Sequence, residues 1–470
     1  MNTNKLQQLL IKNFKHELTT QQSDVVDQLS EFVEESNSNS LFLLKGYAGT
    51  GKTTLISSLI NSLWSVGKKV VLLAPTGRAA KVLSGYSKKS AFTIHKKIYW
   101  IRTNSQGNSY VALQENKHTN TIFIVDEASM IPDVNDKGFS GRVLLDDLID
   151  YVYSGLMCKL IFVGDTAQLP PVHLDVSPAL DHNLLGVKYR KDVYSAELTQ
   201  VVRQESSSLV LKNATDLRDT ISKDGTSYPN ISCDHDVQRL DVGMDIQDAL
   251  EDAYSNSGVE GTVVICRSNK RANLYNQQIR LRIRGHEEEI SSGDFLMVVR
   301  NNYFWLPDGS KAGFIANGDT VEVMRIYEFN ELYNRRFARI SARLVDYPDE
   351  DYIECVVMLD TLTSESPAMT YEEYKALYNE VSKDYSDISQ KAKRNKEIKL
   401  NPFFNALQVK FAYAITCHKS QGGQWENVFV EQGYFIDEML NKEYFRWLYT
   451  AMTRTTKRLF LINFKKEFFN

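Results

Sequence analysis

Residues 46–53 have the side chains and glycine spacing of a phosphate-binding loop. They read Gly46-Tyr-Ala-Gly-Thr-Gly-Lys-Thr53, directly after the apolar run Leu41–Leu44 and before a helical stretch. Glycines at this spacing let backbone N–H groups close on phosphate oxygens, and the helix N-terminus adds a positive dipole. Lys52 is expected to hold the β- and γ-phosphates of a nucleotide and Thr53 a Mg²⁺ ion. The predicted nucleotide contacts in this loop are Gly46, Gly49, Gly51, Lys52, Thr53 and Thr54.

Two carboxylates follow a second apolar run. Asp126 and Glu127 come directly after Ile122–Val125. Phosphoryl transfer to water needs one carboxylate at Mg²⁺ and another that polarises the attacking water, and we assign these roles to Asp126 and Glu127 in that order. An isolated Val-Asp-Glu would be an ordinary solvated strand end. The phosphate loop upstream favours the catalytic interpretation.

A third apolar run ends in Phe162-Val-Gly-Asp165 and is followed by Gln168. Asp165 alone could serve as a helix N-cap. Beside the other two motifs, Gln168 is expected to sense the γ-phosphate and to couple the nucleotide state to the neighbouring domain.

Composition excludes several classes of protein. The chain has 470 residues, 43% of them hydrophobic, which excludes wholesale disorder and predicts about two to four domains. With 55 Lys and Arg against 59 Asp and Glu, positive charge for nucleic acid must be local. The 5 cysteines form no CxxC pair, which argues against a zinc ribbon or a disulfide framework. No apolar run approaches the ~18 residues of a membrane span, so a cytoplasmic protein is expected.

The elements that must position these residues follow the same pattern in two blocks of the chain. In each block a short apolar run is followed by a polar loop and a helix. Continuous apolar runs indicate strands covered on both faces, hence parallel sheets flanked by helices. The predicted fold is α/β with two parallel-sheet lobes. The expected strands are Leu41–Leu44, Val70–Ala74, Ile122–Val125 and Leu160–Val163 in the first lobe, and Val263–Cys266, Phe411–Ile415, Val428–Val430 and Leu459–Ile462 in the second.

Two stretches interrupt this rhythm. Residues 98–120 alternate polar and apolar side chains around a turn, which predicts a β-hairpin inserted in the first lobe. Residues 286–360 contain short alternating strands and predict a β-barrel inserted in the second lobe, followed by an amphipathic helix from Tyr371 to Ile388. The basic residues between Lys391 and Lys399 either solubilise a helix face or line a nucleic-acid strand.

The order of the motifs resembles that of superfamily 1 DNA helicases, in particular the 5′→3′ branch with Dda-like and RecD-like members. Beside the three motifs above, the resemblance rests on Leu18-Thr-Thr-Gln-Gln22, Ala74-Pro-Thr-Gly-Arg78, Thr93-Ile-His95, Leu198–Gln204, Ala414–Gly422 and Tyr449-Thr-Ala-Met-Thr-Arg454. It implies that both lobes are RecA-like and that the barrel inserted in the second lobe is SH3-like. It also implies ATP and Mg²⁺ as cofactors, with Gln22 at the adenine edge and Arg203 and Arg454 as arginine fingers at the γ-phosphate. Lys52, Glu127, Gln168, Arg203 and Arg454 form the predicted catalytic set, and Thr53 and Asp126 the metal ligands.

The resemblance also implies a track for single-stranded DNA. The residues expected to face it are Pro75, Thr76, Arg78, Thr93, His95, Thr416, His418 and Ser420. Both histidines could instead be structural. The hairpin lies where relatives carry a wedge that splits duplexes, so Trp100 or Tyr110 could stack on the junction base pair, or could equally pack the hairpin. Relatives can carry an aromatic or histidine after the Pro-Thr where this chain has Gly77-Arg78, which favours a phosphate contact by Arg78.

These patterns together predict an ATP-dependent DNA helicase that translocates 5′→3′ on single-stranded DNA, with polarity implied by the resemblance alone. Alternatives are a translocase that displaces bound proteins with little unwinding, or a nucleotide-gated binding module. Expected partners are single-stranded and forked duplex DNA and replication or recombination proteins; a monomer in the cytoplasm of a bacterial or phage-infected cell is expected. The expected domain ranges are 1–97, 121–205 for the first lobe, 98–120 for the hairpin, 206–285 and 405–470 for the second lobe, and 286–404 for the barrel with its helical extension.

Overall fold

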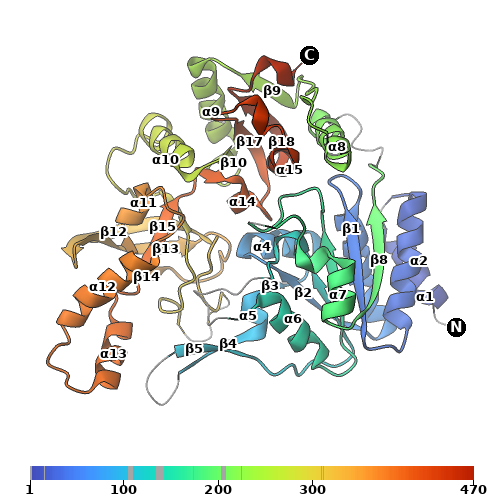
Figure 1. Cartoon of the computed structure of the whole chain (residues 1–470), viewed down its shortest axis with the longest axis horizontal. Helices are drawn as coiled ribbons and strands as arrows, with labels where there is room; N and C mark the ends of the chain where they lie inside the picture. Colours follow the sequence, from blue (N-terminus) through green and yellow to red (C-terminus); the bar gives the residue numbers. More distant parts are fainter. Residues whose placement is uncertain are drawn as a thin grey trace.

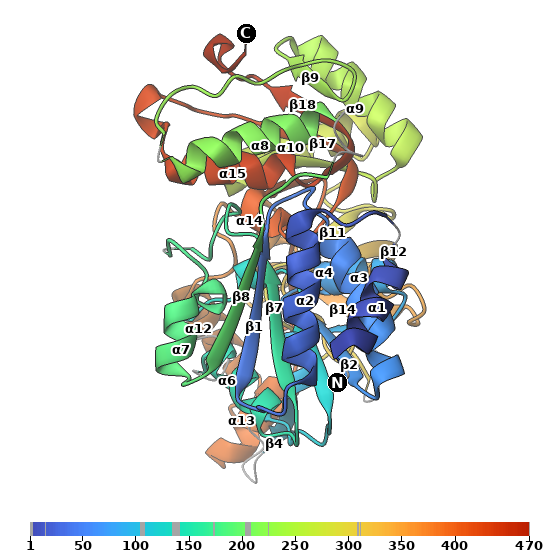
Figure 2. The same ribbon diagram turned by 90° about the vertical axis from the view of Figure 1, so that its right-hand side faces the viewer.

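A computed structural model describes residues 3–14, 16–103, 109–133, 142–172, 174–202, 208–223, 225–307, 310 and 312–469. Two parallel sheets form the cores of two lobes that face each other, with lobe 2 above lobe 1 in Figure 2. A closed barrel and a two-stranded hairpin complete the architecture in Figure 1. The predicted fold class is confirmed, whereas the domain limits stay predictions.

Lobe 1 is built on a six-stranded parallel sheet. Its order is β3 (Ala91–Thr93), β2 (Lys69–Ala74), β6 (Thr121–Val125), β7 (Lys159–Gly164), β1 (Ser40–Gly46) and β8 (Asp192–Leu198). The helices of this lobe are α1 (Thr3–Asn13), α2 (Thr20–Glu34), α3 (Lys52–Leu63), α4 (Gly77–Ser87), α5 (Ile94–Ile98), α6 (Leu144–Tyr153) and α7 (His182–Lys188). Because β7 pairs with both β1 and β6, the carboxyl ends of these three strands meet, and each carries one predicted motif.

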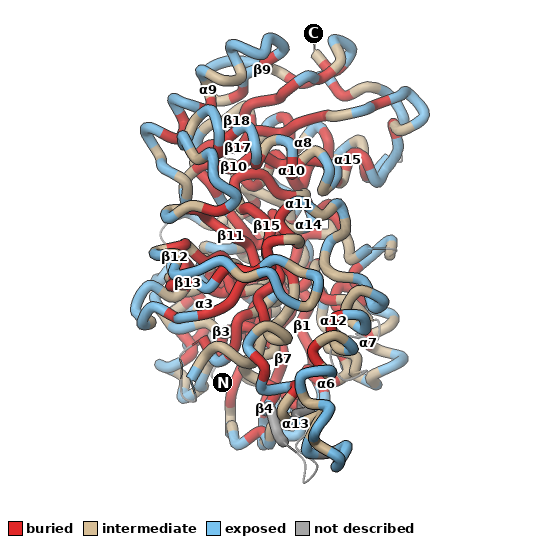
Figure 3. Tube along the Cα trace, turned by 90° about the vertical axis from the view of Figure 1, so that its left-hand side faces the viewer, coloured by how far each residue is buried: buried red, intermediate tan, exposed pale blue. Residues whose placement is uncertain are grey.

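Lobe 2 has a five-stranded parallel sheet. Its order is β16 (Ala414–Thr416), β10 (Thr262–Cys266), β17 (Trp425–Glu431), β18 (Thr455–Ile462) and β9 (Val237–Leu240). The helices of this lobe are α8 (Leu209–Ser222), α9 (Gly243–Ser257), α10 (Asn269–Gln278), α14 (Cys417–Ser420) and α15 (Lys442–Met452). The central strands of both parallel sheets are largely buried in Figure 3, as their continuous apolar sequences require, whereas the edge strands β8 and β9 are partly exposed.

The barrel contains strands that precede a group of three helices in the chain and one strand that follows it. It contains β11 (Phe295–Val298), β12 (Thr320–Leu332), β13 (Arg335–Leu344), β14 (Ile353–Met358) and β15 (Leu407–Phe411), with α11 (Asp360–Thr363), α12 (Tyr371–Lys383) and α13 (Lys391–Leu400) between the last two. The hairpin of lobe 1 pairs β4 (Tyr99–Thr103) with β5 (Ser109–Leu113).

Two predicted elements differ from the structure. The run Phe411–Ile415 is divided, because Phe411 pairs with Leu296 in the barrel while Ala414 pairs with Val264 in lobe 2. Both halves are apolar, so periodicity could not separate them. The helix predicted from Tyr371 to Ile388 ends at Lys383. Its buried residues are Leu377 and Val381, and Tyr371 is exposed, so aliphatic side chains pack this helix more than the tyrosine stripe does.

Candidate nucleotide site and nucleic-acid track

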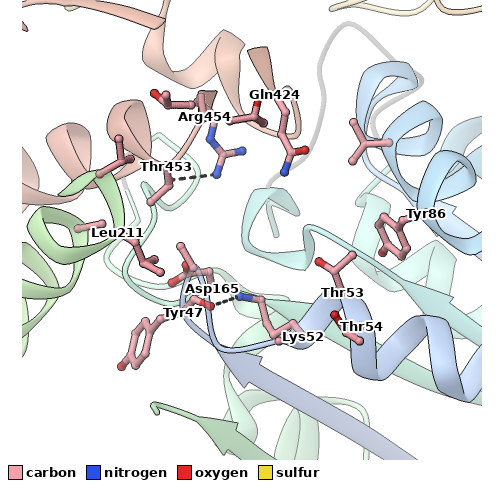
Figure 4. A pocket seen from close by; sticks show the side chains of 18 of the residues that line it. Tyr47, Lys52, Thr53, Thr54, Tyr86, Asp165, Leu211, Gln424, Thr453 and Arg454 are labelled. Atoms are coloured by element: carbon pink, nitrogen blue, oxygen red, sulfur yellow. Dashed lines mark hydrogen bonds between the residues drawn. The ribbon is translucent and has the colours of Figure 1, made fainter. Parts of the chain in front are cut away.

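The phosphate loop leads from β1 into α3, which begins at Lys52. Gly49 and Gly51 have φ of +74° and +86°, the left-handed region that glycine adopts readily. A Cβ at Gly51 would lie 2.5 Å from Gln22 Nε2, so a side chain there would also displace the glutamine. Lys52 Nζ donates to the Tyr47 carbonyl at 2.7 Å, which holds the ammonium inside the loop (Figure 4).

A cleft of about 1350 Å³ opens in front of this loop. Lys52, Thr53 and Thr54 face it from lobe 1, and Gln424 and Arg454 extend into it from lobe 2 (Figure 4). Gly49, Gly51, Asp126, Glu127 and Gln168 also line it. The structure therefore brings most of the predicted nucleotide and catalytic residues together in one place. Their individual roles remain predictions.

The two carboxylates at the end of β6 differ in their surroundings. Asp126 accepts the Tyr86 hydroxyl at 2.6 Å and the Glu127 N–H at 2.9 Å. Burial raises the pKa of Asp126, and the neighbouring Glu127 charge adds to this rise. Glu127 has φ of +52°, a conformation that is uncommon for a residue with a side chain and that occurs often at functional sites.

Tyr86 was not predicted from the sequence. It lies on α4 and lines the cleft, and its hydroxyl orients the carboxylate expected at Mg²⁺. The segment Lys81–Ser87 carries no recognisable motif, so only the packing of α4 against the lobe reveals this contact.

Gln168 and Asp165 lie at the end of β7. Asp165 Oδ1 accepts the Ala167 N–H at 2.9 Å, so the carboxylate stabilises a turn; no described helix begins there, and the N-cap alternative is wrong. Gln168 is 7% exposed, and its Oε1 has no hydrogen-bond partner among the residues described. A buried amide oxygen without a partner is costly unless a ligand or water meets it. This oxygen therefore fits a site that a nucleotide completes.

Arg454 follows α15 and is 4% exposed. Its Nε donates to the Thr450 carbonyl at 3.1 Å, and its Nη1 lies 3.6 Å from Glu127 Oε1 across the cleft. A guanidinium of lobe 2 thus contacts the predicted catalytic base of lobe 1. Arg203, the other predicted finger, lies outside the described residues.

Both the oxygen and the nitrogen of the Gln22 side-chain amide make hydrogen bonds. Its Oε1 accepts the Thr19 N–H at 3.0 Å in the capping box of α2, and its Nε2 donates to the Thr50 carbonyl at 3.0 Å. These bonds tie the start of α2 to the phosphate loop. Contact with adenine stays a prediction, because it would require the amide to share or exchange these partners.

The residues present fit Mg²⁺ with a bound triphosphate. Thr53 and Asp126 line the cleft with oxygen atoms, and Mg²⁺ in such sites takes few protein ligands because phosphates and water supply the others. The described part of the chain contains no group of three or more His, Cys, Asp or Glu side chains arranged for a metal ion.

The threonines of the predicted DNA track occupy helix starts. Thr76 accepts the Ala79 N–H at 3.2 Å as N-cap of α4, Thr93 accepts the Lys96 N–H at 3.2 Å as N-cap of α5, and Thr416 is N-cap of α14. Helix N-termini suit phosphate contacts. Ser420, in contrast, is fully buried and donates to the Cys417 carbonyl at 2.7 Å. Its predicted DNA contact stays untested.

A second, smaller cavity of about 170 Å³ gathers part of this track. It joins elements of both lobes and the barrel, and its lining includes Thr76, Arg78, Asn317, Gly318, His418 and Lys419. The Arg78 guanidinium also lies 4.6 Å from the centre of the Trp425 ring of lobe 2. Trp425 was not predicted from the sequence, and this contact gives Arg78 a role between the lobes beside any phosphate contact.

The barrel meets lobe 1 next to this cavity. A Cβ at Gly77 would lie 2.3 Å from Asp319 Oδ1, so glycine allows the close approach of the barrel to the start of α4. Asp319 is buried, and burial together with the charge of Asp346 raises its pKa to about 7. Lys96 of α5 lies 5.7 Å from the ring centre of Tyr347.

The remaining predicted residues lie near the hairpin or at the edge of the track. His95 packs beside Tyr99 with ring centres 5.8 Å apart, and Pro75 is partly buried after β2. Trp100 is 56% exposed on β4 and is free to meet another molecule. The backbone of Tyr110 pairs with Arg102, and its side chain lies outside the description.

Two stretches of the chain match known families. Residues 17–225 match the AAA domain, and residues 411–462 match the UvrD-like helicase C-terminal domain. The first stretch contains Lys52, Glu127 and Gln168, and the second contains His418 and Arg454. These two matches support a superfamily 1 helicase.

Proteins with similar sequences include two named enzymes and a protein of similar length. Uncharacterized protein R530 of Acanthamoeba polyphaga mimivirus is 24% identical over 94% of this chain and 98% of its own. ATP-dependent RecD2 DNA helicase of Deinococcus radiodurans is 30% identical over 43% of this chain and 24% of its own. ATP-dependent DNA helicase dda of Enterobacteria phage T4 is 28% identical over 54% of this chain and 55% of its own. The helicase spans about half or less of the two named enzymes. Among its described residues, no helix is both long and apolar enough to span a membrane.

Proposed function

We propose that this superfamily 1 helicase hydrolyses ATP to move along single-stranded DNA in the 5′→3′ direction and to separate duplex strands. The contact of Arg454 with Glu127 across the cleft carries the proposal. A triphosphate between Lys52 and Arg454 is attracted from both sides, because cations of the two lobes share one anion. ATP binding therefore favours the closed arrangement, and hydrolysis removes the shared anion.

Within the cleft each residue has a proposed task. Lys52 binds the β- and γ-phosphates, Glu127 accepts a proton from the attacking water, and Arg454 stabilises the charge that develops on the γ-phosphate. Mg²⁺ held by Thr53 and Asp126 supplies charge neutralisation at the phosphate oxygens when bound. Gln168, whose amide oxygen lacks a partner among the described residues, contacts the γ-phosphate or the attacking water.

The nucleic acid is proposed to pass between the lobes and the barrel. The cavity that joins Thr76, Arg78 and His418 lies at the meeting point of these three parts. Polar and basic side chains there contact phosphates and need not read bases. The polarity rests on the resemblance to Dda-like and RecD-like members of the family. We also propose a monomer that acts in the cytoplasm with replication or recombination proteins.

Two assays test this function together. ATP hydrolysis is measured with and without single-stranded DNA, and unwinding is measured on duplexes with a 5′ or a 3′ tail. The proposal expects hydrolysis stimulated by DNA and unwinding of the 5′-tailed duplex. Stimulated hydrolysis without unwinding, together with removal of a protein block, would identify a translocase that displaces proteins. Absence of DNA-stimulated hydrolysis would contradict the motor.

A further inference from the structure

One hydroxyl of lobe 2 is enclosed by groups of lobe 1. Tyr449 lies on α15 and is 1% exposed. Its Oη accepts the backbone N–H of Ala48 at 2.9 Å and donates to Asp165 Oδ2 at 2.6 Å. Burial raises the pKa of Tyr449 well above its ordinary range, so the hydroxyl keeps the proton that it donates.

Both partners of this hydroxyl belong to the nucleotide site. Ala48 is part of the phosphate loop, and Asp165 ends β7 and lines the same cleft as Lys52. Burial raises the pKa of Asp165, and the positive charge of Lys52 and the bond from Tyr449 offset only part of this rise. Tyr449 therefore connects lobe 2 to the loop and to the strand end that surround the phosphates.

Neighbouring bonds hold the same part of lobe 2 in place. Thr450 Oγ1 accepts the Leu169 N–H at 2.8 Å, and Gln421 Nε2 donates to the Leu169 carbonyl at 2.7 Å. The Thr450 carbonyl in turn accepts Arg454 Nε at 3.1 Å. Tyr449, Thr450 and Arg454 thus lie together at the C-terminal end of α15, and Gln421 adds a contact from the end of α14.

We propose that Tyr449 is a positioning residue that stabilises the closed arrangement of the lobes and thereby places Arg454 at the γ-phosphate. The inference rests on the proposed function and adds a specific residue to it. In the closed arrangement the Ala48 N–H and the Asp165 carboxylate are buried and need the hydroxyl as a partner. When the lobes separate, water can take its place. Removing the hydroxyl therefore destabilises the closed arrangement selectively.

The test is Tyr449→Phe, with Tyr444→Phe as the matched control. Tyr444 is buried on the same helix, but its hydroxyl accepts Gln432 Nε2 at 3.0 Å within lobe 2. Both variants lose one buried tyrosine hydroxyl from α15, and only one of them loses a bond between the lobes. Comparison therefore separates lobe closure from helix packing.

Closure is measured by energy transfer between two dyes. One dye is attached to Cys233, an exposed thiol of lobe 2, and the other to Trp64→Cys on lobe 1, where Trp64 is 81% exposed. The other described cysteines are buried. Energy transfer is recorded without nucleotide and with ADP–beryllium fluoride and single-stranded DNA. Hydrolysis and the affinity for a fluorescent ADP are measured in parallel.

We expect Tyr449→Phe to lower the closing equilibrium constant and the DNA-stimulated kcat about tenfold, which corresponds to ~1.4 kcal/mol. ADP affinity should stay within about twofold, since lobe 1 binds most of the nucleotide, and Tyr444→Phe should close like the wild type. Wild-type closure of the lobes in Tyr449→Phe would overturn the positioning role. An equal loss of closure and kcat in Tyr449→Phe and Tyr444→Phe would overturn it as well. If the wild type itself shows no closure with nucleotide and DNA, the proposed motor fails instead.

Discussion

Arg454 of lobe 2 lies 3.6 Å from the carboxylate of Glu127 in lobe 1, and both side chains line the same cleft. An ion pair at this separation holds the guanidinium next to the position where the γ-phosphate would bind. We propose that bound ATP competes with Glu127 for Arg454, which leaves the carboxylate free to accept a proton from water.

Arg454→Lys tests the finger directly. Lysine keeps the charge but loses the planar guanidinium that binds an oxygen anion with two donors. We expect kcat for ATP to fall by about 10²–10³-fold, within the range of arginine-finger contributions, with a smaller change in KM. Steady-state hydrolysis with single-stranded DNA measures both constants. Arg458→Lys, on β18 and paired with Asp252, serves as control. An equal fall of kcat in both variants would contradict the role of Arg454 as an arginine finger.

Glu127→Gln separates binding from hydrolysis. The amide keeps the shape of the side chain but cannot accept the proton, so ATP should bind while turnover falls at least about 100-fold. Isothermal titration with ATP and a phosphate-release assay check the two effects. Turnover near that of the wild type would exclude Glu127 as the base.

Lys52→Ala should abolish ATP hydrolysis, because the phosphates lose the ammonium that the loop holds at Tyr47. Single-strand binding, measured by fluorescence anisotropy, should stay near the wild-type value. Lys383→Ala, an exposed lysine at the end of α12, is the control. Hydrolysis that persists in Lys52→Ala would reject the phosphate loop.

Replacing Trp100 and Tyr110 with Ala should impair strand separation more than hydrolysis, since the exposed Trp100 ring is available to stack on a base at the junction. Unwinding of a forked duplex and DNA-stimulated hydrolysis are compared in the same preparation. Trp64→Ala removes another exposed tryptophan from lobe 1 and should change neither. Parallel loss of both activities would favour packing of the hairpin.

Asp319 predicts a pH dependence of stability. Its pKa rises from 3.8 to about 7 in the folded chain, because it is buried near Asp346 and only partly compensated by Lys96 and Arg78. A raised pKa gives stability that is complete below the unfolded value and is lost as pH rises through about 7. The wild type should therefore lose more stability between pH 5 and pH 8 than Asp319→Asn, by a few kcal/mol at most.

Urea denaturation at both pH values measures this difference. Asp349→Asn, at an exposed position between β13 and β14, should keep the wild-type dependence. Identical pH dependence in Asp319→Asn and the wild type would show that the Asp319 carboxyl does not hold its proton in the folded protein.

The sequence by itself determined the local chemistry of this protein. The phosphate loop, the pair Asp126 and Glu127, and Gln168 were recognisable because each motif follows an apolar run, and parallel strands bring their carboxyl ends together. The two lobes, the hairpin and the barrel followed from strand patterning. The pattern of apolar residues could not show where one strand ends and the next begins. Strand pairing in the structure assigns Phe411 to the barrel and Ala414 and Ile415 to the sheet of lobe 2.

Only the tertiary structure decided which residues meet across the cleft. Tyr86 on Asp126, Trp425 on Arg78, and Tyr449 on Ala48 and Asp165 join residues that lie far apart in the chain. Tyr86 and Trp425 belong to no recognised motif. Tyr449 begins the motif that ends in Arg454, but a tyrosine there could equally have been a core residue. The relative placement of the lobes is a long-range property, so the contacts that couple nucleotide to movement emerge only when both sheets are in position.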